Sequence, residues 1–143
     1  MKVKQISVFL ENKQGRLQEV LQALADNEIN LVAMYLADTA EYGMLRLIVS
    51  DPEKGRKVLK DLSLNASIVE VVAIRVPHAC GSLCTAMTYL VEAGINVEYM
   101  YAFANGEDAS FIFKTKTPDK AIEIVTEKGF KVYTSEEAYV LNQ

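Results

Sequence analysis

The chain has no tryptophan, one histidine, two cysteines and three prolines among its 143 residues. Because a Ser–His–Asp triad is built around a histidine, a chain with a single histidine offers at most one candidate for hydrolytic catalysis of this kind. The sequence also contains no glycine-rich phosphate-binding motif and no carboxylate cluster of the kind that binds magnesium or cleaves glycosides. We therefore expect a protein that is not an enzyme and that holds no cofactor.

Long apolar runs are also missing. No segment approaches the roughly 18 apolar residues that a membrane-spanning helix needs, and the run after Lys4 is too short for a signal peptide. With two cysteines and no export signal, we expect a cytoplasmic location. The net charge of −4 provides no general attraction to nucleic acid. Half of the residues are hydrophobic and 24% are charged, which is typical of a folded globular protein.

An internal repeat runs through the chain at a constant shift of 66 residues. The matched segments are Gly15-Arg16-Leu17 with Gly81-Ser82-Leu83, Ile29-Asn30-Leu31 with Ile95-Asn96-Val97, Met34-Tyr35 with Met100-Tyr101, Pro52-Glu53-Lys54 with Pro118-Asp119-Lys120, and Glu70 with Glu136. None of these matches needs a gap. The sequence therefore predicts two copies of one unit, at residues 1–70 and 71–143.

Hydrophobic periodicity predicts the order strand, helix, strand, strand, helix, strand in each copy. In the first copy the expected strands are 3–10, 29–37, 44–49 and 68–76, with helices beginning after Gly15 and Asp51 and a hairpin turn from Thr39 to Gly43. The expected buried helix positions are Leu17, Val20, Leu21 and Leu24, then Val58, Leu59 and Leu62, then Leu83, Met87, Leu90 and Val91, then Ile124 and Val125. This order is the α+β, ferredoxin-like βαββαβ pattern, an antiparallel sheet with two helices on one face.

The junction between the copies has no linker. Residues 71–76 align with the first strand of the first copy and also overlap its expected last strand, since Val71 to Ile74 match Glu137 to Val140. The alignment thus places the last strand of the second copy at residues 137–140. We expect either one long strand shared or split between the units, or a strand exchanged between them. Either arrangement would couple the units closely through strand 71–76.

The segment from Phe9 to Leu17, followed after one helix by Ile29-Asn30-Leu31, resembles the ACT domain, a module that binds small amino acids and regulates enzymes. The closest resemblance is to the regulatory ACT domain of phosphoglycerate dehydrogenase, through residues 30–36 and 44–47. It covers both halves, at residues 3–76 and 71–141. It implies a tandem ACT protein that senses a free amino acid.

The resemblance also implies where a ligand would sit. In that family the amino acid lies between two paired domains, against the loop before the first helix and the asparagine that starts the second strand. Carried over, the first copy would use Asn12, Gly15, Arg16, Leu17 and Asn30, and the second copy His78, Cys80, Gly81, Ser82, Leu83 and Asn96. The proline that often precedes the glycine is replaced by Gln14 and Cys80, and Asn12 is replaced by His78. We therefore expect the first copy to hold the preferred site.

The chemistry of these residues suits a zwitterion, although other roles stay open. Free N–H groups at a helix start can bind a carboxylate, and an asparagine amide both donates and accepts. However, the glycines also fit turns, and the asparagines fit turns or helix caps. The pairs Met34/Met100 and Tyr35/Tyr101 also fit core and interface packing. A metal site at His78, Cys80 and Cys84 is a further alternative, and Cys84 also fits a buried thiol. His78 fits a ligand contact, a pH sensor or a plain surface residue. Leu10, Met34 and Val76 are further candidates for lining the pocket.

Two functions follow from these expectations. In the first, the protein binds an amino acid between its ACT units and regulates an enzyme of amino-acid metabolism. We expect it to have no catalytic activity of its own, because the catalytic groups are missing. In the second, it is a ligand-independent interaction or regulatory subunit of an amino-acid biosynthetic enzyme. In both, exposed sheet edges favour a homodimer. No nucleic acid, membrane or metal partner is expected.

Overall fold

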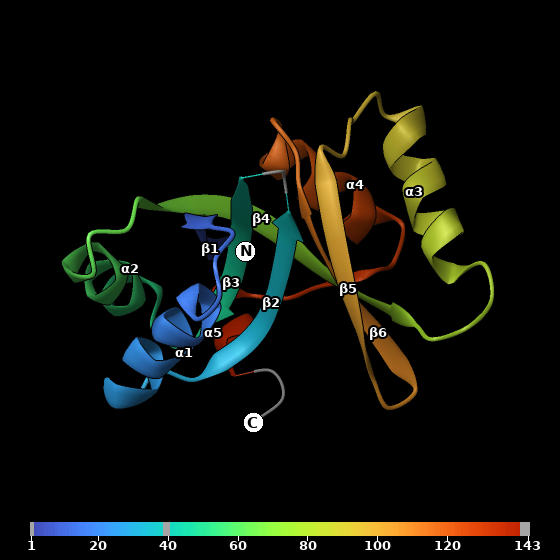
Figure 1. Ribbon diagram of the computed structural model, residues 1–143. Coiled ribbons are helices and arrows are strands. Elements are labelled where there is room, and N and C mark those ends of the chain that lie inside the picture. The colour runs from blue at the N-terminus through green and yellow to red at the C-terminus, as the bar shows by residue number, and fades with distance from the viewer. Residues whose placement is uncertain (1, 39–40, 141–143) are drawn as a thin grey trace. The chain divides into compact units, whose positions relative to one another are not determined.

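The computed structural model describes residues 2–38 and 41–140 (Figure 1). It divides into two compact units. The N-terminal unit contains Lys4–Val69 with residues 139–140, and the C-terminal unit contains Glu70–Ala138 with residues 2–3. In the described part of the chain, no helix is long and apolar enough to cross a membrane.

The N-terminal unit has the predicted order of elements. They are β1 (Val3–Glu11), α1 (Arg16–Asp26), β2 (Leu31–Asp38), β3 (Tyr42–Val49), α2 (Pro52–Asp61) and the first residues of β4 (Ala66–Pro77). The strands lie in the order β2-β3-β1-β4, and β3 is antiparallel to both β1 and β2. Tyr42 and Gly43 belong to β3, so the predicted turn at 39–43 is too long; Thr39 and Ala40 lie outside the described residues.

The C-terminal unit repeats this order and adds a helix. Its elements are the rest of β4, then α3 (Ser82–Glu92), β5 (Tyr99–Asn105), β6 (Asp108–Lys114), α4 (Pro118–Glu127), β7 (Lys131–Val132) and α5 (Ser135–Tyr139). The strands lie in the order β5-β6-β4-β7 with antiparallel pairing throughout. In both units the first and third strands are central, as the ferredoxin-like fold requires. The predicted fold class is confirmed.

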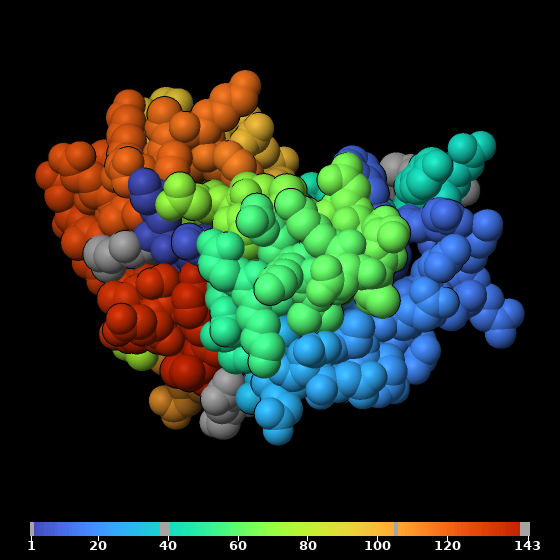
Figure 2. Space-filling model, turned by 90° about the vertical axis from the view of Figure 1, so that its left-hand side faces the viewer, coloured from blue at the N-terminus to red at the C-terminus, as the bar shows by residue number. Residues whose placement is uncertain are grey.

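Each unit has its own core between its helices and its sheet. In the N-terminal unit, Val20, Leu24 and Leu59 of the helices pack with Ile6 and Leu45 of the sheet. In the C-terminal unit, Leu90 and Val125 pack with Phe111 and Phe113. The surfaces of α1 (blue) and α2 (green), which contact each other, are visible in Figure 2.

Two of the predicted core positions are wrong. Leu62 follows the end of α2 as its C-cap and is 44% exposed. Val91 is 67% exposed because Ala86 and Leu90 provide the fully buried positions of α3. Hydrophobicity alone does not indicate that the small side chain of Ala86 is buried, whereas it wrongly favours burial of Val91.

The sequence repeat reappears in the backbone hydrogen bonds. Asn12 N–H donates to the Glu41 carbonyl at 3.0 Å, and the equivalent His78 N–H donates to the Glu107 carbonyl at 2.8 Å. The Ile29 N–H donates to the Leu24 carbonyl and the equivalent Ile95 N–H to the Leu90 carbonyl, both at 2.9 Å. Likewise, the Leu64 N–H donates to the Leu59 carbonyl at 3.2 Å, and the Phe130 N–H donates to the Val125 carbonyl at 3.0 Å. The loops and helix ends of the two copies therefore have equivalent hydrogen bonds, as well as equivalent strands.

The repeat stops before the C-terminus, and the predicted strand at residues 137–140 is wrong. The last strand is β7, and residues 135–139 form α5. The cause is a capping box: Glu137 N–H donates to Thr134 Oγ1 and Thr134 N–H donates to Glu137 Oε1, both at 3.1 Å. This reciprocal pair satisfies two backbone donors at a helix start and so favours a helix over a strand.

The junction between the copies is a single strand. β4 runs without interruption from Ala66 to Pro77, and the boundary between the compact units falls between Val69 and Glu70. Of the arrangements considered from the sequence, the structure therefore shows one long strand that contributes residues to both units.

Candidate functional site

The loop between β1 and α1 is shaped by Gly15. This residue is the N-cap of α1 and has a φ of 88°, in the left-handed region that glycine adopts at little cost. Gly81 occupies the same place before α3, with a φ of 85°. A Cβ at either glycine would meet nothing within 4 Å. The backbone conformation, rather than close approach of a neighbour, therefore explains both glycines.

A small pocket lies beside this loop, entirely within the N-terminal unit. It has a volume of about 80 Å³ and is lined by Leu10, Glu11, Asn12, Lys13, Arg16, Leu17, Leu36 and Gly43. Three of the predicted site residues, Asn12, Arg16 and Leu17, are thus brought together. Leu10 was also expected at the pocket, whereas Met34 packs against the core and Val76 lies in the C-terminal unit.

Charged groups of both signs surround the pocket. Lys13 Nζ lies 2.9 Å from Glu11 Oε2, and Arg16 Nη2 lies 3.9 Å from the same oxygen. The hydrogen bond from Lys13, followed by the charges of Lys13 and Arg16, lowers the pKa of Glu11 below its ordinary value. Glu11 is therefore a carboxylate at neutral pH. An anion and two cations at one pocket match the two charges of a zwitterion.

Asn30 lies elsewhere in the unit. Its N–H donates to Ser50 Oγ at 2.9 Å, and its carbonyl accepts from the Ser50 N–H at 2.9 Å. It lines a separate open groove with Leu21, Ala25 and Leu31. Asn12 and Asn30 are on either side of α1, whose 11 residues span about 16 Å. The structure therefore does not bring Asn12 and Asn30 together within one unit.

The C-terminal unit keeps the loop but not its charges. The positions of Glu11, Lys13 and Arg16 are taken by Pro77, Ala79 and Ser82. His78 and Cys80 are exposed in this loop, and Ser82 and Leu83 are half-buried at the start of α3. Asn96 lines another groove with Gly94, Glu98 and Thr115.

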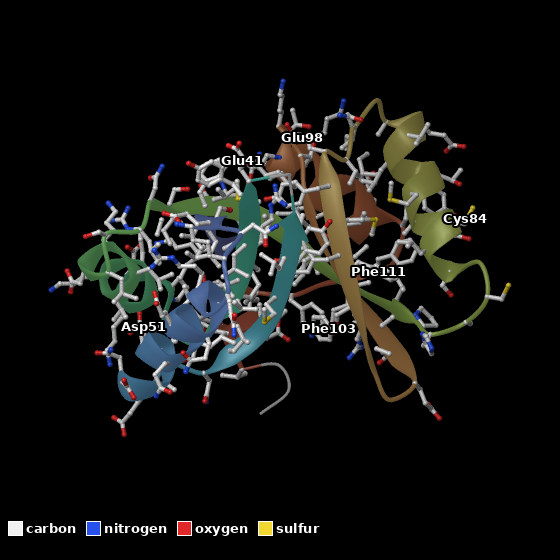
Figure 3. The ribbon with its side chains drawn as sticks, in the orientation of Figure 1. Glu41, Asp51, Cys84, Glu98, Phe103 and Phe111 are labelled. Carbon is white, nitrogen blue, oxygen red and sulfur yellow. The ribbon has the colours of Figure 1, made fainter. Side chains whose placement is uncertain are left out.

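Both cysteines are free and exposed. Cys84 is exposed, so the prediction of a buried thiol is wrong; Figure 3 shows it on the side of α3 that points away from the sheet, whereas Phe111 points toward the helix. Among residues 2–38 and 41–140, no group of three or more His, Cys, Asp or Glu side chains is arranged to hold a metal ion.

Comparison with known proteins agrees with this fold. The sequence pattern of the ACT domain pair family matches residues 1–141. The chain belongs to the ACT domain pair family. A crystal structure of a protein from Bacteroides thetaiotaomicron is 42% identical to this ACT domain pair, covers 99% of it and 98% of its own chain, and has a TM-score of 0.95. No curated protein matches the pair.

More distant structures share only the fold. The regulatory subunit of aspartate kinase from Thermus thermophilus, in a ligand-free form, is 14% identical, covers 88% of this ACT domain pair and 92% of its own chain, and has a TM-score of 0.66. The corresponding subunit from Thermus flavus is 17% identical, with coverages of 87% and 90% and a TM-score of 0.62.

Four residues at the pocket of this ACT domain pair were not predicted from the sequence: Glu11, Lys13, Leu36 and Gly43. Glu11 and Lys13 flank Asn12, so their charges within the motif loop were a usable signal. Leu36 and Gly43 gave no such signal, because they reach the pocket only through strand pairing. Gly43 lies opposite Leu10 of β1 and Asp38 of β2.

Proposed function

We propose that this ACT domain pair is a regulatory protein, without catalytic activity of its own, that binds a free amino acid. Its ACT units are residues 1–70 and 71–143, and the preferred site is in the first. The pocket of the N-terminal unit carries the proposal, because it combines Asn12, Arg16 and Leu17 with the carboxylate of Glu11.

The charges around the pocket suggest how the ligand is held. Arg16 and Lys13 would bind the ligand carboxylate, and Glu11 would bind its ammonium group, in charge-assisted hydrogen bonds. Arg16 and Glu11 are 3.9 Å apart, which is too long for a direct hydrogen bond between them. Lys13 Nζ lies 2.9 Å from Glu11 Oε2, and Arg16 Nη1 donates to Glu19 Oε2 at 3.1 Å. The ligand carboxylate would therefore compete with these two ion pairs for the cations. The Asn12 amide can add a donor or an acceptor.

Regulation requires that the ligand favour one arrangement of ACT units over another. We propose that the ligand binds at an interface between ACT units, where Asn30 or Asn96 of one unit would complete the site around the loop of another. This assignment fits the separation of Asn12 and Asn30 across α1. The change would be passed to an enzyme of amino-acid metabolism, as in the regulatory domain of phosphoglycerate dehydrogenase that the sequence resembles, in a cytoplasmic homodimer.

Isothermal titration with each of the twenty amino acids at millimolar concentration tests the proposal. We expect the protein to bind one amino acid or a few similar ones. Arg16→Ala should lower the affinity roughly tenfold or more, because a charged hydrogen bond to the ligand is missing. Ser82→Ala should leave the affinity unchanged. Ser82 is the matched control because it occupies the position of Arg16 in the second copy. The proposal is overturned if none of the amino acids gives heat or a thermal shift. That result would favour the ligand-independent subunit.

A further inference from the structure

We infer that the pocket selects amino acids with small aliphatic side chains, and that Gly43 and Leu36 together set the size limit. The inference rests on the proposed function and deepens it. It specifies the side chain of the ligand, whereas the proposed roles of Glu11, Lys13 and Arg16 involve only the ammonium and carboxylate groups that all amino acids have.

The volume available is small. The pocket measures about 80 Å³, whereas sites for drug-sized ligands occupy roughly 300–1,000 Å³. An aromatic or long side chain therefore has too little room without rearrangement of the wall. Each methylene that does fit adds roughly fourfold to the affinity through burial, so the largest side chain that the wall admits binds best.

The chemistry of the wall is aliphatic away from the loop. Leu10 is 3% exposed and belongs to the core, Leu17 packs partly against that core, and Leu36 is 43% exposed. A carboxylate, amide or ammonium group in the ligand side chain would lose water against these residues, which is costly without a hydrogen-bond partner. The wall therefore favours hydrocarbon side chains over polar ones.

Gly43 keeps the pocket open because it has no side chain. A Cβ placed there would lie 3.0 Å from Leu36 Cδ1 and 3.5 Å from the Ala37 carbonyl oxygen. Its φ is outside the left-handed region, so the backbone does not demand glycine at this position. A methyl group at residue 43 would either occupy pocket volume or displace Leu36. The side chain of Leu36, which lines the pocket, is thus a physical reason for glycine at this position.

The second copy has a different pair at these positions. Ala109 replaces Gly43 and Ala102 replaces Leu36. Compared with the first copy, the second has an additional methyl group at the position of Gly43 and a much smaller side chain at the position of Leu36. The two copies thus suggest that residues 36 and 43 share one volume, so that a change at one can be offset at the other.

Titration of the wild type, Gly43→Ala, Leu36→Ala and the double variant tests the inference, with alanine, valine, leucine, phenylalanine and aspartate as probes. We expect the wild type to bind alanine or valine most tightly. Gly43→Ala should weaken valine binding about tenfold, Leu36→Ala should bring leucine or phenylalanine to within about fivefold of valine, and the double variant should recover most of the valine affinity. Ala109→Gly in the C-terminal unit is the control and should change none of these values.

These variants should fold. Leu36 is 43% exposed, and the contact created by Gly43→Ala is with the end of a flexible side chain. Circular dichroism checks each of them. If the wild type binds no amino acid, the proposed function itself fails. If it binds one and Arg16→Ala weakens it, but changes at residues 36 and 43 leave the order of probes unaltered, only the size limit is overturned. A preference for aspartate or phenylalanine would also overturn it.

Discussion

Arg16 Nη2 and Glu11 Oε2 lie 3.9 Å apart beside the pocket of the N-terminal unit, and their side chains are 39% and 44% exposed. Ion pairs this exposed contribute little to stability, because water screens them. They lie next to Asn12 and Leu17 at the pocket that we propose as the amino-acid site.

Salt should weaken ligand binding. Raising sodium chloride from about 0.05 to about 0.5 M shortens the range of charge–charge attraction, so we expect the dissociation constant to rise about threefold or more. Titration calorimetry at a series of salt concentrations measures it. An affinity that stays constant over this range would contradict direct contact between the ligand and Arg16 or Lys13.

Asp51→Ala should destabilise the protein by about 1 kcal/mol. Asp51, labelled in Figure 3, is the N-cap of α2, and its Oδ1 accepts from the Lys54 N–H at 3.2 Å. Thr117→Ala is the matched control, because Thr117 caps α4 at the equivalent position without a side-chain hydrogen bond. Chemical denaturation gives both free energies of unfolding. Equal losses in the two variants would count against the capping role of Asp51.

Gly55→Ala should also destabilise the protein, by roughly 1–3 kcal/mol. Alanine is a better helix former than glycine, but here a Cβ would lie 2.9 Å from Ile6 Cδ1 and 3.2 Å from Val49 Cγ2. The close packing of α2 on the sheet therefore outweighs helix propensity. Lys57→Ala, at an exposed position of the same helix, should change stability little. A Gly55→Ala protein more stable than the wild type would show that the core relaxes freely.

Acid should remove the contribution of Glu137. The hydrogen bond from Lys131, followed by the backbone hydrogen bond from Thr134, lowers the pKa of Glu137 from its ordinary value of 4.5 to about 2. Because the folded pKa is the lower one, the carboxylate stabilises the fold above pH 4.5, and this contribution is lost as pH falls toward 2. The unfolding temperature of the wild type should thus exceed that of Glu137→Gln at pH 7, and the two should converge near pH 2. A gap that persists at low pH would contradict this.

Much of the fold follows from local sequence patterns. The periodicity of Val20 and Leu24 and the proline after Asp51 predict α1 and α2 correctly. The strand predicted at residues 137–140 is wrong because the repeat alignment ignores the spacing of Thr134 and Glu137, which is that of a capping box. The local hydrogen bonds of the capping box, and not the alignment of the repeat, therefore determine the secondary structure of residues 135–139.

The site was predictable only in part, for a physical reason. Asn12, Arg16 and Leu17 are close in sequence, so one loop motif indicates all three. Leu36 and Gly43 come from two other strands, and their meeting depends on the register that sets Gly43 opposite Leu10 and Asp38. Pairing of this kind cannot be deduced from the residues of either strand alone.

A titration followed by nuclear magnetic resonance tests whether an amino acid binds in the N-terminal unit. With ¹⁵N-labelled protein and the amino acid that binds most tightly, we expect the amide signals of Gly15 and Gly43 to shift in a saturable way. Those of the equivalent Gly81 and Ala109 should stay in place at the same ligand concentration. Shifts confined to Gly81 and Ala109, or no saturable shift at any of the four amides, would contradict an amino-acid site in the N-terminal unit.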